Sequence, residues 1–188
     1  MMGEILYFVR NMIPGAVLAA LVWGAVWPLR RRRLARLGLT TPAARELLLL
    51  LFAAFCGSMA AATLTPPDFD MWHVIRYGYH GTFFSRSTVN WEISREIVRS
   101  LRYIPLYFWG NVVMFAPFGF LPAVLWRRSR WYKALAIAAA VTVTIESWQF
   151  FIGRTFDVDD LLLNSVGAML GWLLWLILRK PTLTCEEI

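Results

Sequence analysis

The stretch TIESWQFFIGRTFDVDDLLLNSVGAMLG, residues 144–171, decides the fold because it joins two apolar segments through a short charged loop. On a helix, Glu146 and Gln149 share one face. After the loop, polar and small residues recur at spacings of three and four, which again keeps them on one helical face: Asp157, Asp160, Asn164, Gly167 and Gly171. Ionisable side chains are costly in hydrocarbon and normally face the interior of a helix bundle. We therefore expect two membrane helices whose polar residues meet along a polar seam.

The composition is that of a membrane protein. Of the 188 residues, 59% are hydrophobic and only 16% are charged, whereas soluble domains carry about 25% charged residues. Several apolar runs reach the roughly 18 residues needed to cross a bilayer. Inside lipid, each backbone polar group must be satisfied within its own segment, which favours helices. We expect an all-α fold, a polytopic membrane helical bundle that forms a single membrane domain over residues 1–188.

The apolar runs predict five transmembrane helices, at about residues 5–29, 47–64, 103–126, 134–152 and 161–178. The first run is too long for a cleavable signal peptide. The second carries small residues, Gly57 and Ser58 among them, that suit close helix contact. In the outer loop, residues 66–102, Asn90 is a good helix cap. It begins an amphipathic helix at 90–103 that either lies on the membrane surface or packs over the bundle.

The net charge of +7 comes from basic residues that lie mostly at the ends of the apolar runs, as topology signals do. This placement argues against a nucleic-acid partner. Twelve of the 19 basic residues fall on one side of the predicted bundle: Arg30–Arg33, Arg36, Arg45, Arg127, Arg128, Arg130, Lys133, Arg179 and Lys180. The positive-inside rule places that side in the cytoplasm. The N-terminus and the polar seam then face outward, and the C-terminus is cytoplasmic.

Glu146 is the most informative residue, because an ionisable side chain within an apolar helix is by default a candidate functional group. The alternative is a buried structural hydrogen bond or an ion pair with Arg154. Arg154 itself suits bidentate recognition of a phosphate or carboxylate. It equally suits a salt bridge to Asp157 or Asp160.

Asp157 and Asp160 have the spacing of a capping box, with Asp157 as the N-cap of the last helix. Acids here also suit a hard cation, but no second acidic motif completes a two-metal site, so we expect neither a metal nor a cofactor. Asn164, Gly167 and Gly171 indicate close helix packing first, with Asn164 also able to donate to Glu146 or to a ligand. Asn111 begins a helix interrupted by prolines, which either fixes a kink or lines a cavity.

Four blocks follow one another in the C-terminal half: NVVMFAPFGFLP at 111–122, ESWQ at 146–149, RTFDVDD at 154–160 and NSVG at 164–167, followed by Gly171. Over roughly residues 105–175 this pattern resembles the VanZ-like family. The resemblance implies a multi-pass protein of the bacterial cytoplasmic membrane. The namesake of the family is linked to resistance to teicoplanin, a lipidated glycopeptide, more than to vancomycin.

Two functions remain open at this point. The first is a binding protein for a lipid-linked cell-envelope intermediate or a lipoglycopeptide, with seven ligand-binding candidates: Asn111, Glu146, Gln149, Arg154, Asp157, Asp160 and Asn164. The second is a membrane enzyme acting on a lipid-linked or peptidoglycan-terminal substrate, with Glu146 as acid or base. The serine-hydrolase motif G-x-S-x-G and the zinc motif H-E-x-x-H do not occur. A purely structural seam is a third reading, and the oligomeric state is left open.

Overall fold

The structure is a computed structural model. It describes residues 2–66, 69–81, 84, 87–90, 98, 105–126, 130–178 and 186–187. The chain divides into two compact units, each described by itself. Unit 1 is Met1–Thr82 with Leu183–Ile188, and unit 2 is Phe83–Thr182. The single membrane domain stays a prediction.

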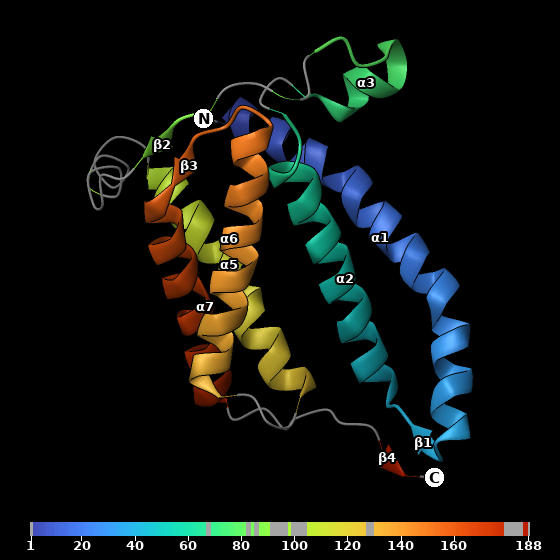
Figure 1. The fold of residues 1–188 in the computed structure, drawn as a ribbon. Coiled ribbons are helices and arrows are strands. Elements are labelled where there is room, and N and C mark those ends of the chain that lie inside the picture. The colour runs from blue at the N-terminus through green and yellow to red at the C-terminus, as the bar shows by residue number, and fades with distance from the viewer. Residues whose placement is uncertain are drawn as a thin grey trace. The chain divides into compact units, whose positions relative to one another are not determined.

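Five helices in the described residues are long and apolar enough to cross a membrane (Figure 1). They are α1 (Met2–Arg36), α2 (Ala43–Thr63), α5 (Pro105–Leu125), α6 (Trp131–Phe151) and α7 (Val158–Leu178). Large apolar side chains on them are exposed, Ile177 to 75% and Leu21 to 67%, as expected of lipid-facing residues. The all-α polytopic bundle predicted from the sequence is confirmed. The amphipathic helix predicted at 90–103 lies almost entirely outside the described residues.

Several helix ends differ from the predicted ones. Helix α1 continues to Arg36 instead of stopping at residue 29, because arginine is a good helix former and a helix need not end where the hydrocarbon ends. Helix α7 begins at Val158 instead of residue 161, because its cap lies earlier in the charged loop. The segment after α2 contains a short helix that was not predicted, α3 (Met71–Tyr77), capped by Asp70.

In unit 1, α1 and α2 cross where two glycines meet. A Cβ atom on Gly15 would collide with the carbonyl oxygen of Gly57, and one on Gly57 with that of Gly15. The same atoms would lie 2.6 Å from the Cβ atoms of Ala61 and Ala19, respectively. This contact confirms the predicted small-residue surface of α2, which lets two backbones approach closely.

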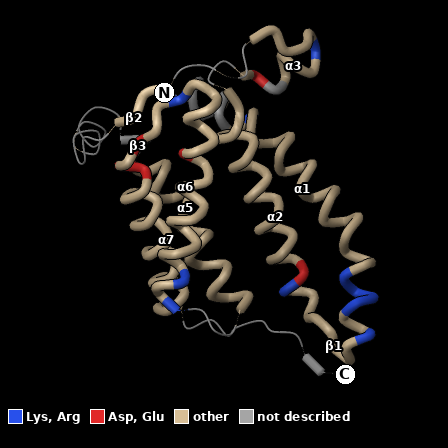
Figure 2. The backbone as a smooth tube through the Cα atoms, viewed as in Figure 1, with Lys and Arg blue, Asp and Glu red and all other residues tan. Residues whose placement is uncertain are grey.

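Polar contacts join α1 and α2 near the basic end of α1, where Figure 2 shows Lys and Arg gathered. Arg30 pairs with Glu46 of α2. The Thr41 hydroxyl donates to the same Glu46 oxygen, Oε1, at 2.6 Å. The strand β1 (Leu39–Thr40), between the two helices, pairs antiparallel with β4 (Glu186–Glu187) near the C-terminus.

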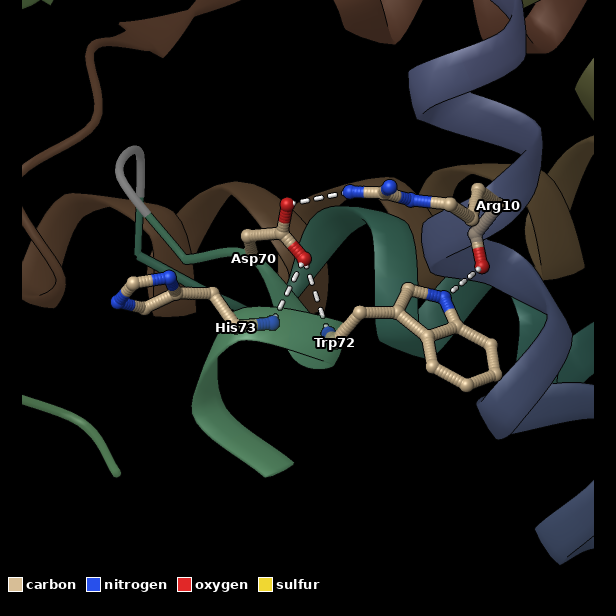
Figure 3. A network of polar contacts seen from close by, with 4 residues as sticks. All are labelled: Arg10, Asp70, Trp72 and His73. Atoms are coloured by element: carbon tan, nitrogen blue, oxygen red, sulfur yellow. Dashed lines mark hydrogen bonds and ion pairs between the residues drawn. The ribbon is translucent and has the colours of Figure 1, made fainter. Parts of the chain in front are cut away.

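A second polar network joins α1 to α3 (Figure 3). Asp70 Oδ2 pairs with Arg10 at 2.5 Å, and Asp70 Oδ1 accepts from the backbone N–H groups of Trp72 and His73 at 2.9 and 3.1 Å. The Trp72 indole N–H donates to the Arg10 carbonyl at 3.1 Å. Partial desolvation acts to raise the pKa of Asp70, but the two backbone donors and Arg10 outweigh it and lower the pKa.

In unit 2, α5 and α7 form the closest crossing. A Cβ atom on Gly167 would collide with the carbonyl oxygen of Val112, and one on Gly171 with that of Ala116. In return, one on Gly119 would collide with the carbonyl oxygen of Ala168. The GxxxG motif of α7 therefore packs two parallel helices together, as predicted. Figure 1 shows α6 beside this pair.

Two short parallel strands close one end of unit 2. Strand β2 (Val89–Asn90) pairs with β3 (Phe156–Asp157), with Val89 opposite Phe156 and Asn90 opposite Asp157. The Thr88 carbonyl accepts from the Phe156 N–H at 3.0 Å. Since β3 immediately precedes α7, this pairing fixes the charged loop at the start of that helix.

Candidate functional site

The first side of the site is one face of α6. Thr142, Glu146 and Gln149 follow one another at spacings of four and three, so they share a helical face. All three are buried, with exposed fractions of 1%, 3% and 9%. Burying polar groups in an apolar helix is costly unless they have partners. The partners come from the charged loop and from α7.

The loop after α6 brings Asp157 to Glu146. Gly153 has a positive φ of 84°, a conformation that glycine adopts without strain, and the Arg154 N–H donates to the Gln149 carbonyl at 3.0 Å. The chain then reaches Asp157, whose backbone N–H donates to Glu146 Oε2 at 2.9 Å. The Glu146 side chain is thus held by a backbone N–H group eleven residues later in the sequence.

Asp157 also caps α7. Its Oδ1 accepts from the Asp159 N–H at 3.0 Å, which satisfies a backbone donor at the start of the helix. The predicted N-cap is confirmed. The other carboxylate oxygen, Oδ2, accepts from Asn90 Nδ2 of β2 at 3.4 Å. The sequence suggested Asn90 only as a helix cap, and nothing local in the sequence indicates this contact, because the two residues are 67 positions apart.

The third helix of the seam is α5, which contributes Asn111. The Nδ2 group of Asn111 donates to Asp160 Oδ1 of α7 at 2.7 Å. The carboxyl group of Asp160 also lies close enough to that of Glu146 to interact with it. Side chains of α5, α6 and α7 therefore converge at the end of unit 2 where α7 begins.

Asn164, one turn further along α7, bonds deeper in the seam. Its Nδ2 group donates to Thr142 Oγ1 at 3.1 Å, and the residue is 5% exposed. The expected hydrogen bond from Asn164 to Glu146 is not the one that forms. Thr142 accepts the hydrogen bond instead, because it lies one turn before Glu146 and level with Asn164. Asn164 Oδ1 is buried, and no described residue donates a hydrogen bond to it.

These contacts define the polar seam by six residues: Asn111, Thr142, Glu146, Asp157, Asp160 and Asn164. Gln149 is buried on the same face of α6, and Arg154 is half-buried in the loop. No ion pair joins Glu146 to a basic side chain within the part of the chain that the structure describes. The predicted roles of Gln149 and Arg154 in ligand binding stay predictions.

Among the described residues, no group of three or more His, Cys, Asp or Glu side chains is placed to hold a metal ion. The carboxylates are occupied by backbone and amide donors instead. His73 and His80, in unit 1, are exposed.

The fold and the seam define a multi-pass helical membrane protein with a buried polar cluster between three apolar helices. Comparison with known families agrees: the model of the VanZ/LLP1 family matches residues 16–179. The chain belongs to this family. No curated protein and no solved structure matches the chain.

Proposed function

We propose that this protein binds the polar headgroup of an amphiphile at the membrane surface. The occupant is a lipid-linked cell-envelope intermediate or a lipoglycopeptide. One observation carries the proposal: Glu146, 3% exposed within an apolar helix, meets Asp157 and Asp160 without an ion pair in the described residues. Such a group in a membrane helix marks a functional site more often than a structural one.

Membership of the VanZ/LLP1 family supports a role in the envelope of a bacterium, including a contribution to teicoplanin resistance. The proposed location is the cytoplasmic membrane, with the N-terminus outside and the C-terminus in the cytoplasm. The distribution of basic residues supports this orientation. In this orientation the seam, at the start of α7, lies in the outer leaflet, where a lipid-anchored ligand can reach it from the side.

Binding is favoured over catalysis by the way Glu146 is held. Its Oε2 atom accepts a hydrogen bond from the Asp157 backbone N–H. A general acid or base must instead reach a proton of the substrate. The bonds of Asn164 to Thr142 and of Asn111 to Asp160 hold the helices together, so part of the seam is structural, and the binding function rests on Glu146.

The direct test is equilibrium binding of a fluorescent lipid-linked peptidoglycan precursor to the purified protein in nanodiscs. We expect Glu146→Ala to weaken binding by about tenfold or more, the size of one hydrogen bond to a charged group. Thr144→Ala is the matched control, because Thr144 lies on the same helix, is exposed, and donates its hydroxyl to the Ala140 carbonyl one turn earlier. Equal binding by wild type and Glu146→Ala would show that the polar seam is not the binding site.

The resistance role is tested separately in a glycopeptide-sensitive Gram-positive host. We expect the wild type to protect against teicoplanin more than against vancomycin, and Glu146→Ala at matched protein level to lose that protection. A well-expressed wild type that protects against neither antibiotic would contradict the resistance role. Headgroup binding would then still be decided by the nanodisc measurement.

A further inference from the structure

The last turns of α1, in unit 1, carry a dense run of arginines (Figure 2). Residues 30–46 contain six arginines and one acidic residue, Glu46. Two of these arginines contact neighbours within unit 1. Arg30 pairs with Glu46 of α2, and the guanidinium carbon of Arg31 lies 4.9 Å from the ring centroid of Trp27. The remaining arginines of α1 are placed differently.

Three arginines of α1 share one exposed face with a leucine. Leu29, Arg32, Arg33 and Arg36 follow one another at spacings of three, one and three, which keeps them on the same side of a helix. All four are exposed, Leu29 to 63%. In the described part of the chain, no acidic side chain pairs with any of the three arginines, which we call the arginine face. Like charges one turn apart on a helix repel each other, so this face favours a bound anion.

The arginine face lies at the height of lipid headgroups if Trp27 marks the edge of the hydrocarbon, as tryptophan does in membrane proteins. Trp27 is 38% exposed. Arg32 follows it by five residues, which is about 8 Å along the helix axis. The headgroup layer on each side of a bilayer is about 5–8 Å thick, and arginine side chains reach several ångströms along the helix toward it. The exposed Leu29 then lies on the hydrocarbon side of the arginines.

We infer that the arginine face binds the phosphate groups of anionic phospholipids in the adjoining leaflet. A guanidinium group donates two parallel hydrogen bonds to a phosphate, and an anionic headgroup also compensates the charge that the three arginines share. Leu29 supplies an apolar contact for the acyl chain of the same lipid. The inference goes beyond the proposed function, because it concerns unit 1 and uses no residue of the polar seam.

Two simpler roles do not account for this arrangement. The positive-inside rule requires basic residues near a helix end, but it does not require that they share a face or that they remain unpaired. The helix macrodipole favours cations only in the last turn, whereas Arg32 lies one turn before the final residue, Arg36. A nucleic acid or a soluble phosphate would gain nothing from the exposed Leu29 beside the arginines.

The test uses the purified full-length protein in mixed micelles and displacement of a phosphatidylglycerol labelled on its acyl chain. The competitors are unlabelled phosphatidylglycerol, phosphatidylcholine, which carries the same phosphate but no net charge, and soluble glycerophosphoglycerol. We expect phosphatidylcholine to compete about tenfold or more weakly than phosphatidylglycerol. Equal competition by the two lipids overturns the inference. This comparison needs only the wild type, so it does not depend on a variant that folds.

Variants then place the preference on α1. Each arginine near an anionic surface contributes about fivefold in affinity, so Arg32→Gln/Arg36→Gln should lose most of the preference for phosphatidylglycerol. Arg130→Gln/Lys133→Gln is the matched control, because it removes two exposed basic side chains at the start of α6 and should keep the preference. If the α1 double variant shows the thermal transition of the wild type and also keeps the full preference, the inference fails.

The single variant Arg36→Gln replaces the double variant if the latter does not fold. Arg36 is exposed at the last residue of α1, and we expect its loss to weaken phosphatidylglycerol binding about fivefold. An unchanged affinity in this variant would count against the arginine face in the same way.

The soluble competitor distinguishes a membrane ligand from a free one. We expect glycerophosphoglycerol to displace the labelled lipid far more weakly than intact phosphatidylglycerol, because it lacks the acyl chains that contact Leu29. Displacement as strong as that by the intact lipid would identify a site for soluble phosphates and overturn the assignment to the membrane. None of these outcomes affects the headgroup binding proposed for the polar seam, which is tested through Glu146 in unit 2.

Discussion

Asn111 on α5 donates a hydrogen bond to Asp160 on α7 at 2.7 Å, immediately beside the point where these helices touch backbone to backbone. The next residue, Val112, places its carbonyl oxygen against Gly167. Gly167 lies two turns after Asp160 on the same face of α7. One face of α7 therefore carries both the polar seam and the glycine crossing, so the crossing sets the separation at which the seam residues meet.

Replacing Asn111 should moderately weaken the contact between α5 and α7. Asn111→Leu removes the donor to Asp160, and we expect it to lower the free energy of unfolding by about 1 kcal/mol, the usual size of one interhelical hydrogen bond in a membrane protein. The measurement is SDS-induced unfolding in mixed micelles. Val113→Leu is the control, because Val113 is 65% exposed on the same helix and should change stability little. Equal stabilities of the two variants would show that the hydrogen bond contributes nothing measurable.

Adding a side chain at the crossing should be more damaging. In Gly171→Val the new Cβ atom collides with the backbone of Ala116, which cannot rotate away as a side chain can. We expect a loss of about 1–3 kcal/mol or more, read from the thermal transition of the purified protein.

Gly110→Ala is the matched control for Gly171→Val. Gly110 lies on α5, and a Cβ atom there has no neighbour within 4 Å. Alanine favours a helix over glycine by about 0.5–1 kcal/mol, so this variant should be as stable as the wild type or slightly more stable. If Gly171→Val were equally tolerated, the close approach of α5 and α7 would not hold in solution.

The sequence predicts the helices and the composition of the seam because both depend on local patterns. Apolar runs of sufficient length predict the five helices, and the spacing from Asp157 to Gly171 predicts the face of α7 that packs. The cap at Asp157 also follows from a short motif. The placement of Glu146 against the loop could be anticipated because only eleven residues separate it from Asp157.

Contacts between distant residues could not be predicted in this way. The pairing of β2 with β3 joins positions 67 apart, and Arg30 near the end of α1 pairs with Glu46 in the first turn of α2. Asn164 could reach either Thr142 or Glu146 from its helical position, and the relative height of α6 and α7 decides in favour of Thr142. The last arginines of α1 extend the helix rather than end it, because charge marks the membrane boundary and not the helix boundary.

The proposed orientation predicts that the two ends of α6 lie on opposite sides of the membrane. Single cysteines at Lys133 and Thr155, both exposed, would be introduced after Cys56 and Cys185 are changed to serine. In intact cells, a membrane-impermeant maleimide should label Thr155→Cys, while Lys133→Cys should react only after the cells are opened. Labelling in the opposite order would invert the orientation and place the seam on the cytoplasmic side.

Acid should release the contact between α1 and α3 through Asp70. The pKa of this carboxyl lies below its usual value of 3.8 because the N–H groups of His73 and Trp72, together with Arg10, outweigh the effect of desolvation. A lowered pKa means that ionised Asp70 stabilises the fold above pH 3.8, and that this contribution is lost as the pH falls through the lowered pKa. We expect hydrogen exchange to show protected Trp72 and His73 amides at neutral pH and reduced protection in acid. Asp70→Asn keeps a capping side chain but cannot titrate, so its protection should lack this acid-dependent loss. If both proteins lose protection in parallel, another group controls the acid sensitivity of α3.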